Sequence, residues 1–305
     1  VVLLGEDQEP LRPAIVWLDQ RRTRQHRPLP LWLEAGLRIA RQRRTVHFVQ
    51  SKAECNWLAA DEPEVWARTR HFVFLSGWYN LKLTGRLGDA VGSQVGYVPF
   101  DARRGDWAGP WHFKWKLVTL GREMLPDLVP CGGSMGQVTA AAAAETGIPE
   151  GLPVYAAAAD KACEVLAAGA WTPDVAVLSY GTTATIATCN DRYVEPIPFI
   201  PPFPAAAPGR FTSELMVQRG YWMVNWFKEQ FGAREVMEAE RQGVAPEVLF
   251  ERMLEATPAG NMGLMLQPFW NPGVKIPGPE AKGAMIGFGD VHDRAHMYRA
   301  IIEGI

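Results

Sequence analysis

The chain has 305 residues and a mass of 33.8 kDa, which at ~150 residues per domain corresponds to about two domains. Its 31 Lys and Arg side chains against 33 Asp and Glu leave a formal net charge of −2, so the basic excess of a general nucleic-acid-binding protein is missing. No stretch approaches the ~18 apolar residues of a membrane span, and the first residues do not resemble a signal peptide, so we expect a cytoplasmic protein without nucleic-acid or membrane partners.

The first part of the chain is predicted to hold one strand and two long helices. An apolar strand is expected over 13–18, followed by an Arg-rich amphipathic helix over 21–44. A second helix is predicted over 63–83, because a Thr-Gly pair ending at Gly85 is a typical helix stop. Residues 88–112 are rich in Gly, Asp and aromatic side chains without a period, which predicts a long loop or short strands.

The middle of the chain has a more regular pattern. A helix over 135–146 is followed by a Gly- and Pro-containing turn, and a β-type run over 152–159 leads into a small-residue helix over 161–170. Two further apolar runs, 175–180 and 184–189, are separated by only three residues and therefore predict a β-hairpin.

The last part is predicted to be mostly helical. Residues 195–209 hold a cluster of prolines and indicate a linker or an exposed loop. Helical patterns follow over 221–231, 245–255 and 296–305, and the last one is cut off by the end of the sequence. Because strands alternate with helices in both halves, we expect an α/β fold. The sequence also begins without Met in an apolar run, so we expect a fragment of a longer chain.

Cysteine and histidine patterns do not predict a metal site. The four cysteines (Cys55, Cys131, Cys163 and Cys189) form no C-x-x-C pair, and we interpret them as reduced thiols. His292 and His296 are four residues apart, a spacing that can place two imidazoles on one helix face. Asp293 follows His292 where a zinc-protease motif would have Glu, so we favour a solvated helix start.

Two places carry candidate chemistry. Asp160 follows a predicted strand and precedes a helix, where α/β proteins place ligand sites, but Asp is also a preferred helix N-cap, so both roles stay open. The four alanines before it would let a ligand approach the backbone closely. The turn Gly181-Thr182-Thr183 offers N–H groups and hydroxyls to an anion, although an ordinary hairpin turn is the alternative.

In their order along the chain, these segments resemble the FGGY carbohydrate kinases, the group of xylulokinase, ribulokinase and glycerol kinase. The segments that carry the resemblance are Ile15–Arg21, Trp57-Leu58, Leu83–Gly85, Glu145–Val154, Asp160 with its helix, Gly181–Thr183, Gly283–Phe288, His296-Met297 and Ala300–Glu303. The resemblance implies a two-domain actin-like (ribonuclease H-like) sugar kinase fold, incomplete at both ends. Residues 1–172 would belong to the sugar-binding N-terminal domain and 173–305 to the nucleotide-binding C-terminal domain.

The resemblance further implies an ATP-dependent kinase that phosphorylates a hydroxyl of a sugar or polyol, with ATP and Mg²⁺ as cofactors and the capacity to form a homodimer. Asp160 would be the general base that accepts the proton of the attacking hydroxyl. The implied sugar contacts are Asp19 and Lys161, and the implied nucleotide-binding residues are Gly181, Thr182, Thr183 and Gly220. No residue is assigned as a metal ligand.

The sequence departs from the family pattern at three points. Lys161 stands where many members have Asn or Gln, and Glu54 stands where the first signature has Lys. The Asp-x-Gly-Thr hairpin that holds phosphate and Mg²⁺ in the family has no match. We therefore expect these residues alone not to turn over ATP at a useful rate. The alternatives are a non-catalytic sugar-binding or regulatory relative, an inactive fragment of such a kinase, or an actin-like phosphotransferase that acts on a carboxylate.

Overall fold

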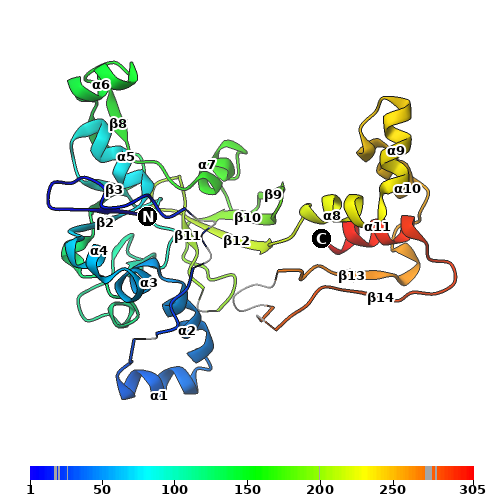
Figure 1. Cartoon of the computed structure of the whole chain (residues 1–305), viewed down its shortest axis with the longest axis horizontal. Helices are drawn as coiled ribbons and strands as arrows, with labels where there is room; N and C mark the ends of the chain where they lie inside the picture. Colours follow the sequence, from blue (N-terminus) through cyan, green and yellow to red (C-terminus); the bar gives the residue numbers. More distant parts are fainter. Residues whose placement is uncertain (17–18, 20, 26, 199, 272–276, 279) are drawn as a thin grey trace. The chain divides into compact units, whose positions relative to one another are not determined.

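The computed structural model describes residues 1–16, 19, 21–25, 27–198, 200–271, 277–278 and 280–305 (Figure 1). The chain forms two compact units, one made of Val1–Ala176 with Thr188–Ser213 and the other of Val177–Ala187 with Glu214–Ile305. The expected domain limits of 1–172 and 173–305 stay predictions. Among the described residues, no helix has the length and apolar character needed to cross a membrane.

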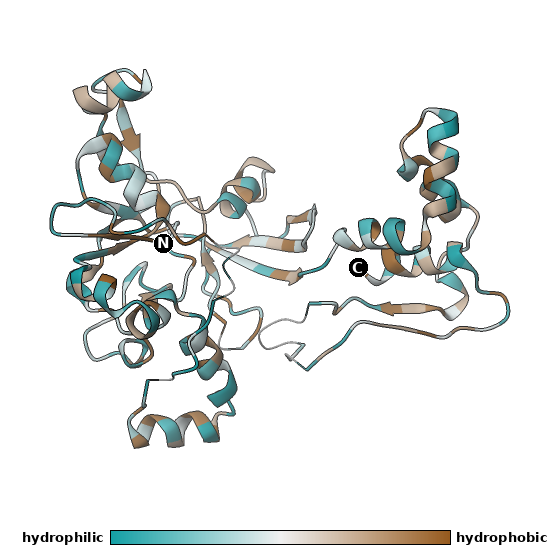
Figure 2. Ribbon diagram, viewed as in Figure 1, coloured by the Kyte–Doolittle hydropathy of each residue, from teal (hydrophilic) through white to brown (hydrophobic). Residues whose placement is uncertain are grey.

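The core of the first unit includes two short strands that are far apart in the sequence. Strand β1 (Val2–Leu4) pairs antiparallel with β2 (His71–Val73), with Leu3 opposite Phe72. All three residues of β1 are buried, and Figure 2 shows this strand as hydrophobic. The strand expected over 13–18 is wrong for its described part, because residues 13–16 form no strand. Ile15 donates its backbone N–H to Val1 O, but this contact does not extend into a strand pair. Pro13 has no N–H to donate, which limits strand pairing.

The expected helix over 21–44 is replaced by shorter elements. The described residues of 21–30 are not helical, because Pro28 and Pro30 cannot donate the hydrogen bonds of a helix interior. The helices that follow are α1 (Leu31–Ile39), α2 (Arg43–Lys52), α3 (Glu54–Asp61) and α4 (Pro63–Arg68).

The helix predicted over 63–83 is interrupted by β2, after which α5 (Leu75–Thr84) begins. The predicted helix stop is confirmed, because Gly85 has a φ of 68° and donates its N–H to Leu81 O. Residues 88–112 hold the short strands β3 (Gly88–Ala90), β4 (Phe100–Asp101) and β5 (Asp106–Trp107), as one of the two expectations stated. Strand β3 pairs in parallel with β6 (Asp127–Val129). The 3₁₀ turns Phe113–Lys116 and Arg122–Met124 lie between β5 and β6.

The helix predicted over 135–146 is correct only in its second half. Residues Ser134–Gln137 form β7, which pairs antiparallel with β8 (Pro153–Tyr155). Helix α6 (Ala140–Thr146) begins after Thr139, whose hydroxyl accepts the N–H of Ala142. Helix α7 spans Asp160–Ala167 and confirms the small-residue helix after the β-type run.

The predicted hairpin is confirmed. Strands β9 (Ala176–Tyr180) and β10 (Ala184–Asn190) are hydrogen-bonded neighbours in a four-stranded sheet of order β11-β12-β10-β9. The proline-rich segment contributes the two-residue strand β11 (Phe203–Pro204), and β12 spans Phe211–Val217.

The second unit builds its core from helices. They are α8 (Trp222–Phe231), α9 (Ala233–Gln242), α10 (Pro246–Glu255) and α11 (Arg294–Gly304), with the hairpin strands β13 (Met265–Gln267) and β14 (Ala284–Ile286). Phe227, Phe250 and Tyr298 pack ring against ring in this core, with centroids 5.0–5.7 Å apart. The three helices predicted here are confirmed, whereas α9 was not predicted.

Candidate active site

The backbone before Asp160 is held against a glycine. Ala159 donates its N–H to Gly92 O at 2.9 Å, and Ala158 forms a parallel bridge with Gly92. A Cβ on Gly92 would lie 2.6 Å from the Cβ of Ala158, so no side chain fits there. The small residues of this segment therefore admit a neighbouring backbone segment, and the contact fixes the point at which α7 begins.

Asp160 is the first residue of α7 and its side chain is exposed. Its Oδ1 accepts the backbone N–H of Lys161 at 2.7 Å. The N-cap position belongs to Ala159, and no side chain caps the helix. The capping interpretation of Asp160 is therefore wrong, and its carboxylate faces solvent at the N-terminal end of a helix, where a negative charge is favoured.

Lys161, an expected sugar contact, has an acidic neighbour on its own helix. Its Nζ forms an ion pair and a hydrogen bond with Glu164, one turn further along α7. The Lys161 side chain is 31% exposed and that of Glu164 54%, so water screens the pair. A sugar hydroxyl that binds Lys161 would have to share this ammonium with Glu164.

Asp19 lies in a pocket of the first unit with a volume of about 150 Å³. Ile15, Trp57 and Tyr97 supply its apolar surface, and Asp19, Arg21, Lys52 and Glu54 supply its charges. Lys52 ends α2 and Glu54 begins α3, so a single intervening residue places both at the pocket. Asp160 does not line it.

Asp19 is paired with a cation inside this pocket. The Nε of Arg21 lies 3.0 Å from Asp19 Oδ1 and 2.9 Å from Oδ2. These hydrogen bonds lower the pKa of Asp19 to about 2. The Arg21 guanidinium also lies 4.0 Å from the ring centroid of Trp57. Arg21 thus connects the carboxylate to the indole face.

The turn Gly181–Thr183 lies in the second unit beside the loop that contains Gly220. Gly220 donates its N–H to Thr182 O at 2.9 Å, and Tyr221 donates to Gly181 O at 3.0 Å. In the described part of the chain, the N–H groups of the three turn residues have no acceptor. Gly181 and Thr182 are exposed, so this turn can offer N–H groups to an anion.

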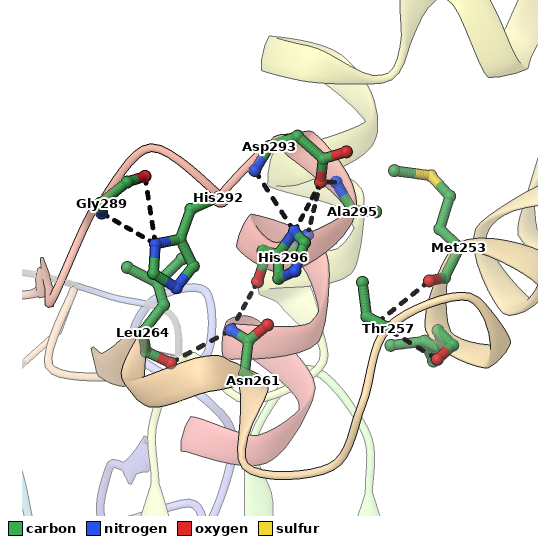
Figure 3. A network of polar contacts seen from close by, with 10 residues as sticks. Met253, Thr257, Asn261, Leu264, Gly289, His292, Asp293, Ala295 and His296 are labelled. Carbon is green, nitrogen blue, oxygen red and sulfur yellow. Dashed lines mark hydrogen bonds and ion pairs between the residues drawn. The ribbon is translucent and has the colours of Figure 1, made fainter.

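His292 precedes α11 and His296 lies in its first turn, so the expected helix start is confirmed (Figure 3). It is not fully solvated, because the His296 side chain is only 13% exposed. Asp293 is the N-cap, and its Oδ1 accepts the N–H groups of Ala295 and His296 at 2.9 and 3.2 Å. The His296 ring lies within 2.8 Å of the same oxygen. Within the ranges that the structure describes, no group of three or more His, Cys, Asp or Glu side chains could hold a metal ion.

The structure thus brings together some of the expected site residues. Gly220 contacts the Gly181–Thr183 turn, whereas no hydrogen bond or ion pair between described residues joins Asp19 to Asp160. Of the pocket residues, the sequence analysis assigned only Asp19 to the site; Ile15, Arg21 and Trp57 lie in segments that carry the resemblance, and Lys52, Glu54 and Tyr97 do not. Of the last three, Glu54 left a signal in the sequence, as an acid at the place of a family lysine.

Comparisons with known proteins agree with this arrangement. The model described as "FGGY family of carbohydrate kinases, N-terminal domain" matches residues 1–167. An uncharacterized sugar kinase of Escherichia coli K12, YgcE, is 30% identical over 234 residues, which cover 75% of this chain and 46% of that protein. The xylulose kinase of Bacillus subtilis is 28% identical over 310 residues, covering 100% of this chain and 59% of the relative. This chain therefore spans about half to three-fifths of these two relatives.

Two solved structures have the same fold. The xylulose kinase from Rhodospirillum rubrum superimposes with a TM-score of 0.78 at 25% identity, and the gluconate kinase from Lactobacillus acidophilus with 0.76 at 20% identity. Each match covers 99% of this chain and 59% of the solved one. The fold is therefore the two-domain actin-like fold of sugar kinases, over the part that this chain spans. The family model matches more than half of the residues, and the chain belongs to the FGGY family of carbohydrate kinases.

Proposed function

We propose that the whole protein transfers the γ-phosphoryl group of ATP to a hydroxyl of a sugar or polyol, with Asp160 as general base. The observation that carries the proposal is the exposed Asp160 carboxylate at the start of α7, positioned by the contact of Ala158 and Ala159 with Gly92. Asp160 accepts the hydroxyl proton while the substrate oxygen bonds to the γ-phosphorus. The bond to the β–γ bridging oxygen breaks at the same time, and ADP leaves.

The Gly181–Thr183 turn is the proposed contact for the nucleotide phosphates. Its N–H groups, which have no acceptor in the described part of the chain, suit phosphate oxygens. Gly220 contacts the turn by donating its N–H to Thr182 O. For Mg²⁺, in contrast, no binding residues can be assigned, because the described residues include no cluster of three or more acids that could hold it. We therefore derive no step through Mg²⁺.

Asp19 and Lys161 are proposed sugar contacts, but each already has an ion-pair partner, Arg21 or Glu164. A sugar would have to compete with these partners. The alternative, a non-catalytic sugar-binding or regulatory relative or an inactive fragment, is motivated by Lys161 and Glu54, which stand where the family has other residues. Formation of a homodimer stays a prediction.

Sugar-dependent ADP release tests the proposal. A panel of ketoses, polyols and sugar acids is offered with ATP to the parent protein, to Asp160→Asn and to Asp61→Asn, a control at an exposed residue of α3. We expect Asp160→Asn to lose about 10²- to 10⁴-fold in rate with an unchanged melting temperature, since the side chain is exposed. An Asp160→Asn protein as active as Asp61→Asn would remove the mechanism. Sugar binding without ADP release by the full-length parent would support the non-catalytic alternative.

A further inference from the structure

Glu54 is a half-buried carboxylate that no other side chain pairs with at ion-pair distance among the described residues. It begins α3 and lines the pocket of the first unit. Among the described residues, its side chain accepts a hydrogen bond from its own backbone N–H but forms no ion pair within 4 Å with another side chain, in contrast to Asp19, both of whose oxygens are bonded to Arg21. Burial raises the pKa of Glu54. A carboxylate whose loss of water outweighs the contacts it gains destabilises the fold, which points to a role in binding a ligand.

The charges around the pocket restrict the class of ligand. Two acids and two bases line it, so their formal charges cancel. Asp19 and Arg21 pair with each other, which leaves Glu54 as the carboxylate able to accept a new hydrogen bond. Glu54 repels an anionic ligand, whereas Lys52 and Arg21 repel a cationic one. A neutral ligand with hydroxyl donors meets neither repulsion.

The size of the pocket agrees with a small ligand. Its volume of about 150 Å³ equals that of an engineered protein cavity that holds one benzene molecule (~150 Å³). Apolar surface from Trp57 and Tyr97 faces the same space, and such rings pack against the C–H faces of a polyhydroxylated carbon chain. One end of a short sugar or polyol therefore fits, with its hydroxyls directed at Glu54.

We infer that Glu54 is a substrate-contact residue that accepts hydroxyl hydrogen bonds and selects neutral sugars or polyols against sugar acids. Asp19, whatever contact it makes with the sugar, also acts as a positioning residue, because its hydrogen bonds hold Arg21 against Trp57. The inference rests on the proposed sugar-kinase function and names the substrate class of its binding pocket.

Calorimetric titration with D-xylulose and D-gluconate tests this assignment. Glu54→Gln removes the charge and keeps the shape, so we expect about tenfold weaker xylulose binding and tighter gluconate binding. The control Glu64→Gln, an exposed glutamate of α4 outside the pocket, keeps both affinities. We expect Asp19→Ala to lower the affinities for both ligands by the same factor, and Asp19→Glu to restore both affinities. The readout is the ratio of the two affinities, which a general loss of folding does not change.

The outcomes separate this inference from the proposed function. An unchanged affinity ratio in Glu54→Gln overturns the role of Glu54, and if Asp160→Asn still abolishes sugar-dependent ADP release, the kinase proposal stands alone. A ratio altered by Asp19→Ala instead of Glu54→Gln overturns the division of roles. Binding of neither carbohydrate to the parent, without ADP release, overturns both proposals. Because Glu54 forms no ion pair within 4 Å among the described residues and Gln can keep the hydrogen bond from the backbone N–H, Glu54→Gln is expected to fold. Glu54→Asp provides a second test, which retains the charge and the preference for xylulose.

Discussion

Replacing Gly220 by alanine tests how tightly the loop that contains Gly220 is packed against the Gly181–Thr183 turn and the start of β10. The added Cβ would lie 2.3 Å from Ala184 N, 2.6 Å from its Cβ and 2.9 Å from its Cα, whereas ordinary contacts begin at 3.4 Å. Two of these three atoms belong to the backbone of β10, so a strand end has to move by about 1 Å, the difference between 2.3 and 3.4 Å. Overpacking in a well-packed site costs ~1–3 kcal/mol, and we expect the upper end of that range.

Gly36→Ala is the matched control for this change. Nothing lies within 4 Å of the Cβ it adds, and the residue sits inside α1, where alanine is favoured over glycine by ~0.5–1 kcal/mol. The same change from glycine to alanine should therefore lower the free energy of unfolding at Gly220 and raise it at Gly36. Urea unfolding gives the sign, and hydrogen exchange of residues 176–190 locates the effect. A Gly220→Ala chain with parental protection of that segment would refute the reasoning.

Three further predictions concern single groups. Arg21→Gln should raise the pKa of Asp19 from about 2 toward the ordinary ~3.9, as followed by carboxyl ¹³C NMR; an unmoved pKa would exclude Arg21 as its cause. Gly85→Ala should lower stability by ~1 kcal/mol in thermal unfolding, because alanine is strained at a φ of 68°. Burial raises the pKa of Cys55 to about 11, so native-state alkylation at pH 8 should label the partly exposed Cys163 first, and equal rates by mass spectrometry would contradict the burial of Cys55.

Local signals predicted the ends of helices well. Gly85 and Gly147 both follow helices and both adopt positive φ, which a short stretch of sequence is enough to indicate. Strand β2 was not predicted, because its three residues gain their stability from pairing with β1, which is distant in the chain. The wrong prediction of a helix over 21–44 has a different cause. Pro28 and Pro30 argue against a helix in the sequence itself, but the prediction gave more weight to the spacing of the apolar residues.

The candidate site shows the same division. Asp160 and the Gly181–Thr183 turn depend on neighbours in the sequence, and the structure finds Asp160 exposed at a helix start and the turn exposed between two strands. The pocket around Asp19 depends on three separate segments, which contribute Glu54 and Tyr97 as well. A single sequence does not show which distant side chains meet, so the half-buried Glu54 was visible only as a departure from a motif.

Glu54 also predicts a pH dependence that separates a binding role from a structural one. Burial raises its pKa in the folded chain. This effect outweighs the hydrogen bond from its own backbone N–H and the attraction of the Val1 α-amino group and Lys52, while Asp19 adds to the rise. The folded state then holds this proton more tightly than the unfolded state, whose Glu pKa is ~4.3. Stability from this group is therefore complete below that value and is lost as pH rises through the folded pKa.

Glu54→Gln should remove this loss, so at pH 7 the variant is expected to be more stable than the parent while it binds xylulose less tightly. Urea unfolding at pH 4 and pH 7 checks the first half and calorimetry the second. A structural carboxylate would behave in the opposite way, because its replacement would break a contact and lower stability at neutral pH. A less stable Glu54→Gln chain at pH 7 would therefore mean that Glu54 serves the fold, whereas greater stability with weaker binding would mean that the protein keeps a destabilising acid for its ligand.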